Sequence, residues 1–302
     1  MEMIPKQTLI ENLELIARQV VEGFIIGLHK SPFHGFSVEF AEHRLYNPGD
    51  PLRHIDWRVY GRTDKMFVKR FEEETNLRCC VAIDTSSSMH FPKDSDRMSK
   101  LQFSCVGAAA LFQLLKRQLD AVSLVLFDEQ INLFSECRSS PTHHRMLINE
   151  LEKTLKLSPL NKQTNAAAAL HRISDQMHKR SLIVVFSDMM DDTEHVEEMF
   201  SALQHLKYNK HEVILFHIAD GEKELEFDFE NRPFEFVDME SGDRVKLQPQ
   251  HIKEQYISQM QGFREMVKNR CHQYHIDYVP VDLAKPVEQV LYSFLLKRNK
   301  LL

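Results

Sequence analysis

The chain has 302 residues, of which 43% are hydrophobic and 27% charged, and its 38 basic and 44 acidic residues give a net charge of −6. This composition is typical of a folded globular protein and excludes a disordered chain or a generally basic nucleic-acid-binding protein. No apolar run approaches the roughly 18–20 residues that a membrane helix needs, and residues 1–14 lack the features of a signal peptide. We therefore expect a cytoplasmic protein with no membrane span, no nucleic-acid partner and reduced cysteines.

Hydrophobic periodicity predicts the elements in chain order. Apolar residues recur every three or four positions over about 6–28, which predicts a helix. Residues 31–78 instead combine turn formers with interleaved positive and negative charges, a pattern that favours internal ion pairs. From residue 79 onward short apolar runs alternate with helical patterns, which is typical of a parallel sheet covered by helices.

The expected strands of this sheet cover 79–83, 121–127, 181–186, 212–218 and 276–281, and the expected helices cover 96–118, 143–155, 166–178, 193–206, 249–273 and 286–298. Residues 131–134 are a candidate hairpin partner for the second strand. The alternation of strand-like and helix-like segments stops near 221–248, where phenylalanines around turns predict a small antiparallel insertion. We expect an α/β fold with two parts. A helix and charged segment in 1–78 pack on a doubly wound, mainly parallel sheet domain in 79–302 with helices on both faces.

The loop after the first strand of this domain carries the candidate chemistry. The strand is followed by Asp84-x-Ser86-x-Ser88, and in open parallel sheets ligands bind beyond the carboxyl ends of the strands. Thr164 opens a later helix, and Asp188 follows the strand at 181–186. All five side chains offer the hard oxygen atoms that Mg²⁺ prefers. On its own the serine-rich loop also fits an ordinary turn with a helix cap.

The order Asp84-x-Ser86-x-Ser88, Thr164, Asp188 resembles the metal-ion-dependent adhesion site of von Willebrand factor A domains. Residues 39–57, EFAEHRLYNPGDPLRHIDW, closely resemble the signature of the MoxR-associated von Willebrand factor A-like family, known as domain of unknown function 58. Gly242, Tyr256, Tyr278 and Arg298 extend the similarity over nearly the whole chain.

The resemblance implies a von Willebrand factor A-like, Rossmann-type sheet with a bound Mg²⁺, for which Mn²⁺ is a substitute. It implies direct contacts to the metal from Asp84, Ser86 and Ser88, and direct or water-mediated contacts from Thr164 and Asp188. Asp191 and Asp192 are alternatives to Asp188, because this chain lacks the glycine that many A domains place after the second aspartate.

The function that the resemblance implies is a non-catalytic protein-binding module. An acidic side chain of a client completes the coordination of the metal, and a MoxR-type AAA ATPase is the partner in chaperone-like assembly or activation of another protein. Two alternatives stay open, a metal-dependent phosphohydrolase or phosphotransferase and a metal-free structural adaptor. An enzyme is disfavoured, because Ser86 stands where an aspartyl-phosphate phosphatase has a second aspartate and no phosphate-binding glycine loop is present.

The charged and aromatic residues of the 39–57 segment have two interpretations. They form either a docking surface for the partner or a brace that ties the N-terminal part to the core. We favour the brace, with a buried tryptophan and an arginine–aspartate ion pair. The residues concerned are Arg44, Tyr46, Asp50, Arg53, Asp56 and Trp57.

Overall fold

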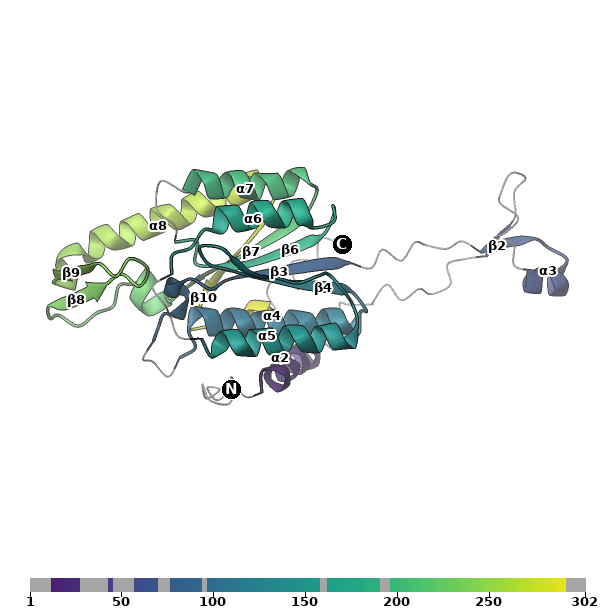
Figure 1. Cartoon of the computed structure of the whole chain (residues 1–302), viewed down its shortest axis with the longest axis horizontal. Coiled ribbons are helices and arrows are strands. Elements are labelled where there is room, and N and C mark those ends of the chain that lie inside the picture. The colour runs from purple at the N-terminus through teal and green to yellow at the C-terminus, as the bar shows by residue number, and fades with distance from the viewer. Residues whose placement is uncertain are drawn as a thin grey trace. The chain divides into compact units, whose positions relative to one another are not determined.

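The computed structural model describes residues 12–27, 43–45, 57–69, 77–93, 97–157, 162–190 and 196–291. Its chain divides into two compact units, residues 1–30 with 77–302 and residues 31–76 (Figure 1). The N-terminal helix therefore belongs to the sheet domain, whereas the charged segment forms a unit of its own. Among the described residues, no helix combines the length and the apolar character that crossing a membrane requires.

The larger unit is built on a six-stranded sheet of order β10–β7–β6–β3–β4–β5. Neighbouring strands are parallel except for β5, which runs antiparallel to β4. The predicted mixed, mostly parallel α/β sheet is confirmed, and its central strands are the buried apolar runs that a sheet covered on both faces requires. The strands are β3 (Arg78–Asp84), β4 (Ala121–Phe127), β5 (Ile131–Phe134), β6 (Leu182–Ser187), β7 (Glu212–Ala219) and β10 (Asp277–Asp282).

The strand order reverses between β3 and β6. After β3 the chain adds β4 and β5 on one side, and then returns to add β6, β7 and β10 on the other. Ile83 of β3 lies opposite Phe186 of β6 in a parallel register, so the loops that follow both strands leave the same edge of the sheet. In doubly wound sheets this switch point is the place where ligands bind.

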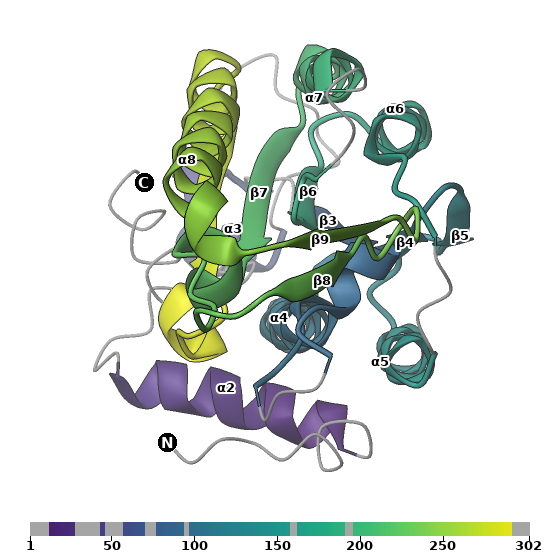
Figure 2. The ribbon, with the colours of Figure 1, turned by 90° about the vertical axis from the view of Figure 1, so that its left-hand side faces the viewer.

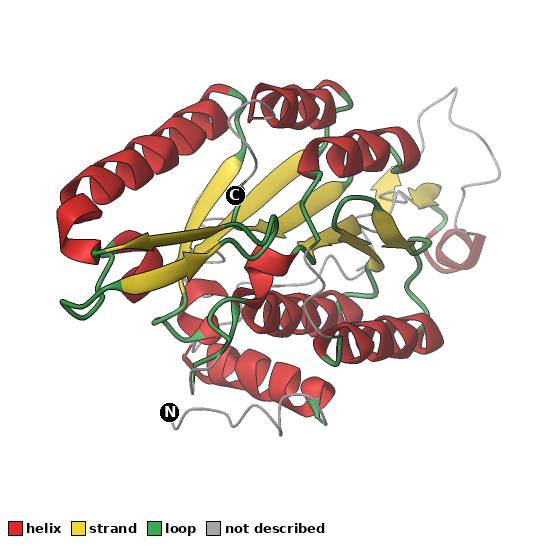
Figure 3. Cartoon of the chain, turned by 60° about the vertical axis from the view of Figure 1, so that its left-hand side comes forward, coloured by secondary structure: helices red, strands yellow, loops and turns green. Residues whose placement is uncertain are grey.

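Helices cover both faces of the sheet (Figures 2 and 3). One face carries α4 (Lys100–Arg117) and α5 (Pro141–Leu155), with α2 (Leu13–Gly27) packed against them. The other face carries α6 (Ala166–Gln176), α7 (Val196–Tyr208) and α8 (Pro249–Gln273). Residues 287–291 are helical as well, within the predicted final helix. Because α4 is enclosed by the sheet, α2 and α5, its sequence is apolar on almost every side.

The N-terminus of α4 is fixed by a capping box. The Ser99 hydroxyl accepts a hydrogen bond from the Gln102 amide, and the Gln102 side chain accepts one from the Ser99 amide. This cap sets the start of the helix beside the Asp84 loop. Replacing Ser99 with alanine is therefore expected to lower the free energy of unfolding by about 1 kcal/mol in urea titrations, and Ser99→Asp is expected to retain most of the stability. Equal losses in both variants would contradict a capping role.

The predicted insertion is an antiparallel hairpin, which is confirmed by the pairing of β8 (Phe234–Val237) with β9 (Arg244–Leu247). A short helical turn, η3 (Gly221–Leu225), precedes it. Figure 2 shows the hairpin running across the end of the sheet that faces the viewer. An aromatic cluster anchors its base, with ring centroids 4.4–6.1 Å apart, formed by Phe227, Phe229, Phe234, Phe236 and Tyr256.

The smaller unit contains β1 (His43–Leu45), α3 (Trp57–Thr63) and β2 (Phe67–Lys69), with β1 antiparallel to β2. The Trp57 side chain is 60% exposed and meets Tyr60 edge-on. Within the described part of this unit, the expectation of a buried Trp57 is therefore wrong, because α3 and the two three-residue strands described there leave most of the indole ring uncovered. Arg44 lies in β1, while Tyr46, Asp50, Arg53 and Asp56 fall outside the described residues.

Candidate functional site

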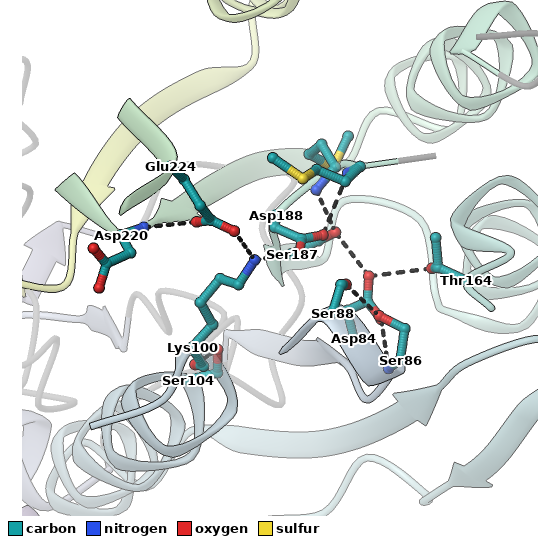
Figure 4. Close-up of polar contacts among 12 residues, drawn as sticks. Asp84, Ser86, Ser88, Lys100, Ser104, Thr164, Ser187, Asp188, Asp220 and Glu224 are labelled. Carbon is teal, nitrogen blue, oxygen red and sulfur yellow. Dashed lines mark hydrogen bonds and ion pairs between the residues drawn. The ribbon is translucent and has the colours of Figure 1, made fainter. Parts of the chain in front are cut away.

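The Asp84 loop leaves the sheet at the switch point and folds back on its own carboxylate (Figure 4). The Ser86 amide donates to Asp84 Oδ1 at 3.0 Å, and the Ser86 and Ser88 hydroxyl oxygens lie 3.1 Å apart. Asp84 and Ser86 are fully buried, and Ser88 is partly exposed in the 3-10 turn η2 (Ser87–His90). The alternating spacing of the motif thus places one carboxylate and two hydroxyls on the same side of the loop.

Two further hydroxyls reach the same carboxylate from other loops. Thr164 Oγ1 donates to Asp84 Oδ2 at 3.1 Å, and Ser187 Oγ donates to the same oxygen at 2.9 Å. Thr164 directly precedes Asn165, whose side chain caps α6, so the position of Thr164 is fixed by a helix start. Sequence analysis missed Ser187 as a contact, although its position at the end of β6 was a usable signal.

Burial and charge repulsion act together on Asp84. Removal from water and the nearby Asp188 carboxylate together raise its pKa to about 6, although the hydrogen bonds from Ser86 and Ser187 lower it. Within the part of the chain that the structure describes, no lysine, arginine or histidine forms an ion pair with Asp84. The site thus contains a buried carboxylate whose negative charge only hydroxyl and amide groups stabilise.

Asp188 has a different environment, because a buried lysine neutralises it. Lys100 Nζ donates to Asp188 Oδ2 and to Glu224 Oε1, both at 2.7 Å, and its side chain is 1% exposed. Burial raises the pKa of Asp188, but Lys100 and the Ser88 hydroxyl outweigh it and hold the pKa below its usual value. The pKa of Lys100 is raised in turn, because its two carboxylate partners outweigh the desolvation that lowers it.

Sequence analysis missed both Lys100 and Glu224. Lys100 is the first residue of α4, and no local pattern distinguishes it as a residue of the site. Glu224 lies in η3, 124 residues further along the chain. Its carboxylate also accepts from the Asp220 amide at 2.7 Å, which links the start of the insertion to the site.

Glu240 reaches the site from the turn of the β8–β9 hairpin. Burial and the Asp188 and Asp84 carboxylates together raise its pKa to about 7, although the Ser88 side chain and the Thr164 backbone lower it. Its Oε1 atom is buried and has no hydrogen-bond partner among the described residues. No sequence signal pointed to this residue, because it lies in an ordinary polar turn.

The structure therefore brings together all five predicted ligands, Asp84, Ser86, Ser88, Thr164 and Asp188, at one edge of the sheet. Their role as ligands stays a prediction. The alternatives Asp191 and Asp192 lie outside the described residues.

A family model described as "Protein of unknown function DUF58" matches residues 42–265 of the chain. The chain belongs to this family. The match covers the charged segment, the Asp84 loop and the hairpin, so the features of the site all lie within the DUF58 region.

Curated relatives include uncharacterized proteins of Mycobacterium bovis and Mycobacterium tuberculosis. Each is 24% identical over 181 residues, which is 60% of this chain, and the match spans only 56% of the relative's own length. Among solved structures, the conserved hypothetical protein BatB from Bacteroides thetaiotaomicron matches with a TM-score of 0.46 and 13% identity over 74% of this chain and 98% of its own. An aerotolerance-related membrane protein from Bacteroides fragilis matches with a TM-score of 0.43 and 14% identity over 75% of this chain and all of its own.

The donor atoms of this DUF58 chain fit Mg²⁺ better than a softer metal. The converging groups are carboxylate and hydroxyl oxygens, and within the described ranges no three His, Cys, Asp or Glu side chains are arranged to hold a metal ion. Zinc sites use nitrogen and sulfur ligands, whereas Mg²⁺ binds through one or two carboxylates and keeps several water molecules. A cation beside Asp84 would also offset the charge repulsion that raises the pKa of this residue.

Proposed function

We propose that this DUF58 protein is a non-catalytic, Mg²⁺-dependent protein-binding module with a von Willebrand factor A-like adhesion site. The supporting observation is the arrangement around Asp84. Its buried carboxylate has no ion-pair partner among the described residues, and it lies with four converging hydroxyls at the switch point of the sheet. Such a group is costly to keep ionised in a protein interior unless a positive charge accompanies it.

In this proposal some residues of the site bind the ion, and others limit the negative charge around it. Asp84, Ser86 and Ser88 hold the cation, and Thr164 orients the Asp84 carboxylate through its hydrogen bond. Lys100 neutralises Asp188, so the protein presents one uncompensated aspartate rather than two. A Mg²⁺ ion held in this way keeps excess positive charge, which attracts the carboxylate of a partner in a partly dry cleft.

The proposed binding partner is a protein with an exposed Asp or Glu side chain. Through the resemblance to the MoxR-associated family, we propose a MoxR-type AAA ATPase as part of the same assembly, acting on a client protein.

The test combines cation binding with partner capture. We expect Mn²⁺ and Mg²⁺ to bind the wild-type chain in calorimetry, and Asp84→Ala to abolish binding because it removes the buried carboxylate that holds the ion. In pull-downs from the native lysate, proteins retained with Mg²⁺ are expected to be lost with EDTA and with Asp84→Ala.

Asp120→Ala is the matched control. Asp120 is also a buried aspartate, but it contacts the Leu77 amide at the opposite end of β3. A partner that is retained in every lane, including the Asp84→Ala lane, would contradict metal-mediated binding. An ATP-dependent or phosphatase activity that disappears in Asp84→Ala would favour the enzyme alternative instead.

A further inference from the structure

The hairpin turn that follows β8 holds Glu240 in a defined position. Asp238 Oδ1 accepts from the Glu240 amide at 2.8 Å, and Asp238 Oδ2 accepts from the Ser241 hydroxyl at 3.0 Å. The Gly242 amide donates to the Asp238 carbonyl, and Gly242 has a φ of 79°, which side chains other than glycine rarely adopt. The turn is therefore closed on itself by its own side chains and projects Glu240 from a fixed backbone.

The hairpin is also fixed at its base. Phe227 is 5% exposed and contacts Phe229, Phe236 and Tyr256, which joins the insertion to the start of α8. Lys223 Nζ lies 5.1 Å from the centre of the Phe229 ring, and η3 is linked to the site through Glu224 and Lys100. Both ends of the insertion are thus attached to the domain that carries the Asp84 loop.

The Glu240 side chain lies beside the proposed cation site. Its carboxyl group hydrogen-bonds the Ser88 side chain and the Thr164 backbone, and both of these residues are predicted ligands. Its Oε1 atom is buried without a hydrogen-bond partner in the described part of the chain, although the neighbouring groups include the carboxylates of Asp84 and Asp188. A buried carboxylate oxygen that has no donor and lies near other carboxylates is unfavourable, and a cation beside it offsets the repulsion.

We propose that Glu240 is an internal ligand of the bound cation, and that it occupies the coordination position that a partner's carboxylate takes. This inference rests on the proposed Mg²⁺ site. It assigns the hairpin a specific role, because a partner binds only by displacing Glu240 from the metal. The affinity for an external carboxylate is then set by a competition between two chemically equivalent groups.

The test uses Mn²⁺ as the probe, with the full-length chain and no partner. Water proton relaxation reports how many exchangeable water molecules a bound Mn²⁺ carries. In Glu240→Gln and Glu240→Ala we expect a higher relaxivity per bound ion, because water enters the vacated position, together with roughly tenfold weaker Mn²⁺ binding. Glu235→Gln is the control, since Glu235 lies in the same hairpin but pairs with Arg244 and Lys246 at the surface.

The possible results separate this inference from the proposed function. If Glu240→Gln and Glu235→Gln match the wild type in affinity and relaxivity while Asp84→Ala abolishes Mn²⁺ binding, the cation site stands and the role of Glu240 is overturned. If the wild type binds no Mn²⁺, both the proposed cation site and the role of Glu240 are overturned. Thermal unfolding of each variant checks folding, and Glu240→Gln keeps the size and shape of the side chain if Glu240→Ala proves unstable.

Discussion

Replacing Lys100 with methionine is expected to lower the free energy of unfolding by about 3–5 kcal/mol in the absence of divalent cations. The lysine is 1% exposed and contacts Asp188 and Glu224 at 2.7 Å each. Methionine fills much of the same space but leaves two carboxylates without their positive partner. Breaking a buried ion pair from one side is far more costly than losing a surface contact, because the remaining charges cannot be solvated.

Urea titrations of the wild type and of Lys100→Met near neutral pH measure this loss of stability. Arg117→Met is the matched control, because it removes a positive charge from the exposed end of the same helix, and its cost is expected to stay within about 0.5 kcal/mol. The double variant Lys100→Met with Asp188→Asn is expected to recover part of the loss, since it removes one of the two uncompensated charges. Equal stabilities of Lys100→Met and Arg117→Met would show that the buried ion pair contributes little.

Lys100→Met also has an expected result with metal. Once Lys100 no longer occupies Asp188, both aspartates are available to a cation, so millimolar Mg²⁺ is expected to stabilise the variant more than it stabilises the wild type. In the same variant two aspartate carboxylates surround the ion instead of one. The additional negative charge weakens the attraction between the ion and a partner's carboxylate. Stronger metal binding and weaker partner binding in one variant would separate the charge-limiting role of Lys100 from a purely structural one.

The architecture of the sheet domain follows closely from the pattern of apolar runs. Residues 121–127 and 249–273 were predicted with the bounds that the structure shows for β4 and α8, because buried parallel strands and long helices have distinct periods. The convergence of Asp84, Ser88 and Asp188, which end or follow β3 and β6, was also predictable. The carboxyl ends of parallel strands meet at one edge, whatever the details of packing.

Contacts that join distant segments could not be predicted in the same way. Lys100 lies 88 residues from Asp188 and 124 residues from Glu224, and no local pattern distinguishes it from the many other basic residues of the chain. Glu240 depends on the path of a hairpin whose position relative to the sheet is set by aromatic packing at its base. For Trp57 the sequence led to a wrong prediction rather than a missed contact. Tryptophan is usually buried, but in the described part of its unit the Trp57 side chain is 60% exposed.

Replacing Asp84 with asparagine is expected to stabilise the metal-free protein while removing its response to Mg²⁺. Asparagine keeps an acceptor for the Ser86 amide and can donate to the Thr164 or Ser187 hydroxyl, so the hydrogen-bond network is retained. What it removes is a buried negative charge close to Asp188. We expect a gain on the order of 1–3 kcal/mol near neutral pH in EDTA.

The pH dependence of this gain follows from the direction of the pKa shift. The pKa of Asp84 is about 6 in the folded chain, above its ordinary value of 3.8, so the carboxyl group destabilises the fold increasingly as the pH rises from 3.8 to 6 and fully above that. The advantage of Asp84→Asn should therefore be full at neutral pH, decrease as the pH falls through the folded value and vanish below the unfolded one. Urea titrations across this range measure it, and Asp120→Asn is expected to show a similar pH dependence, because burial raises the pKa of Asp120 to about 6 at the other end of β3.

Added Mg²⁺ should reverse the order of the two proteins near neutral pH. The wild type gains stability in proportion to cation binding, whereas Asp84→Asn lacks the charge that holds the ion. A wild-type chain that is less stable than its variant in EDTA and more stable in Mg²⁺ would mean that the site sacrifices stability to keep Asp84 ionised for the metal. Identical responses of both proteins to Mg²⁺ would instead favour a loop in which Asp84 serves only as a buried hydrogen-bond acceptor.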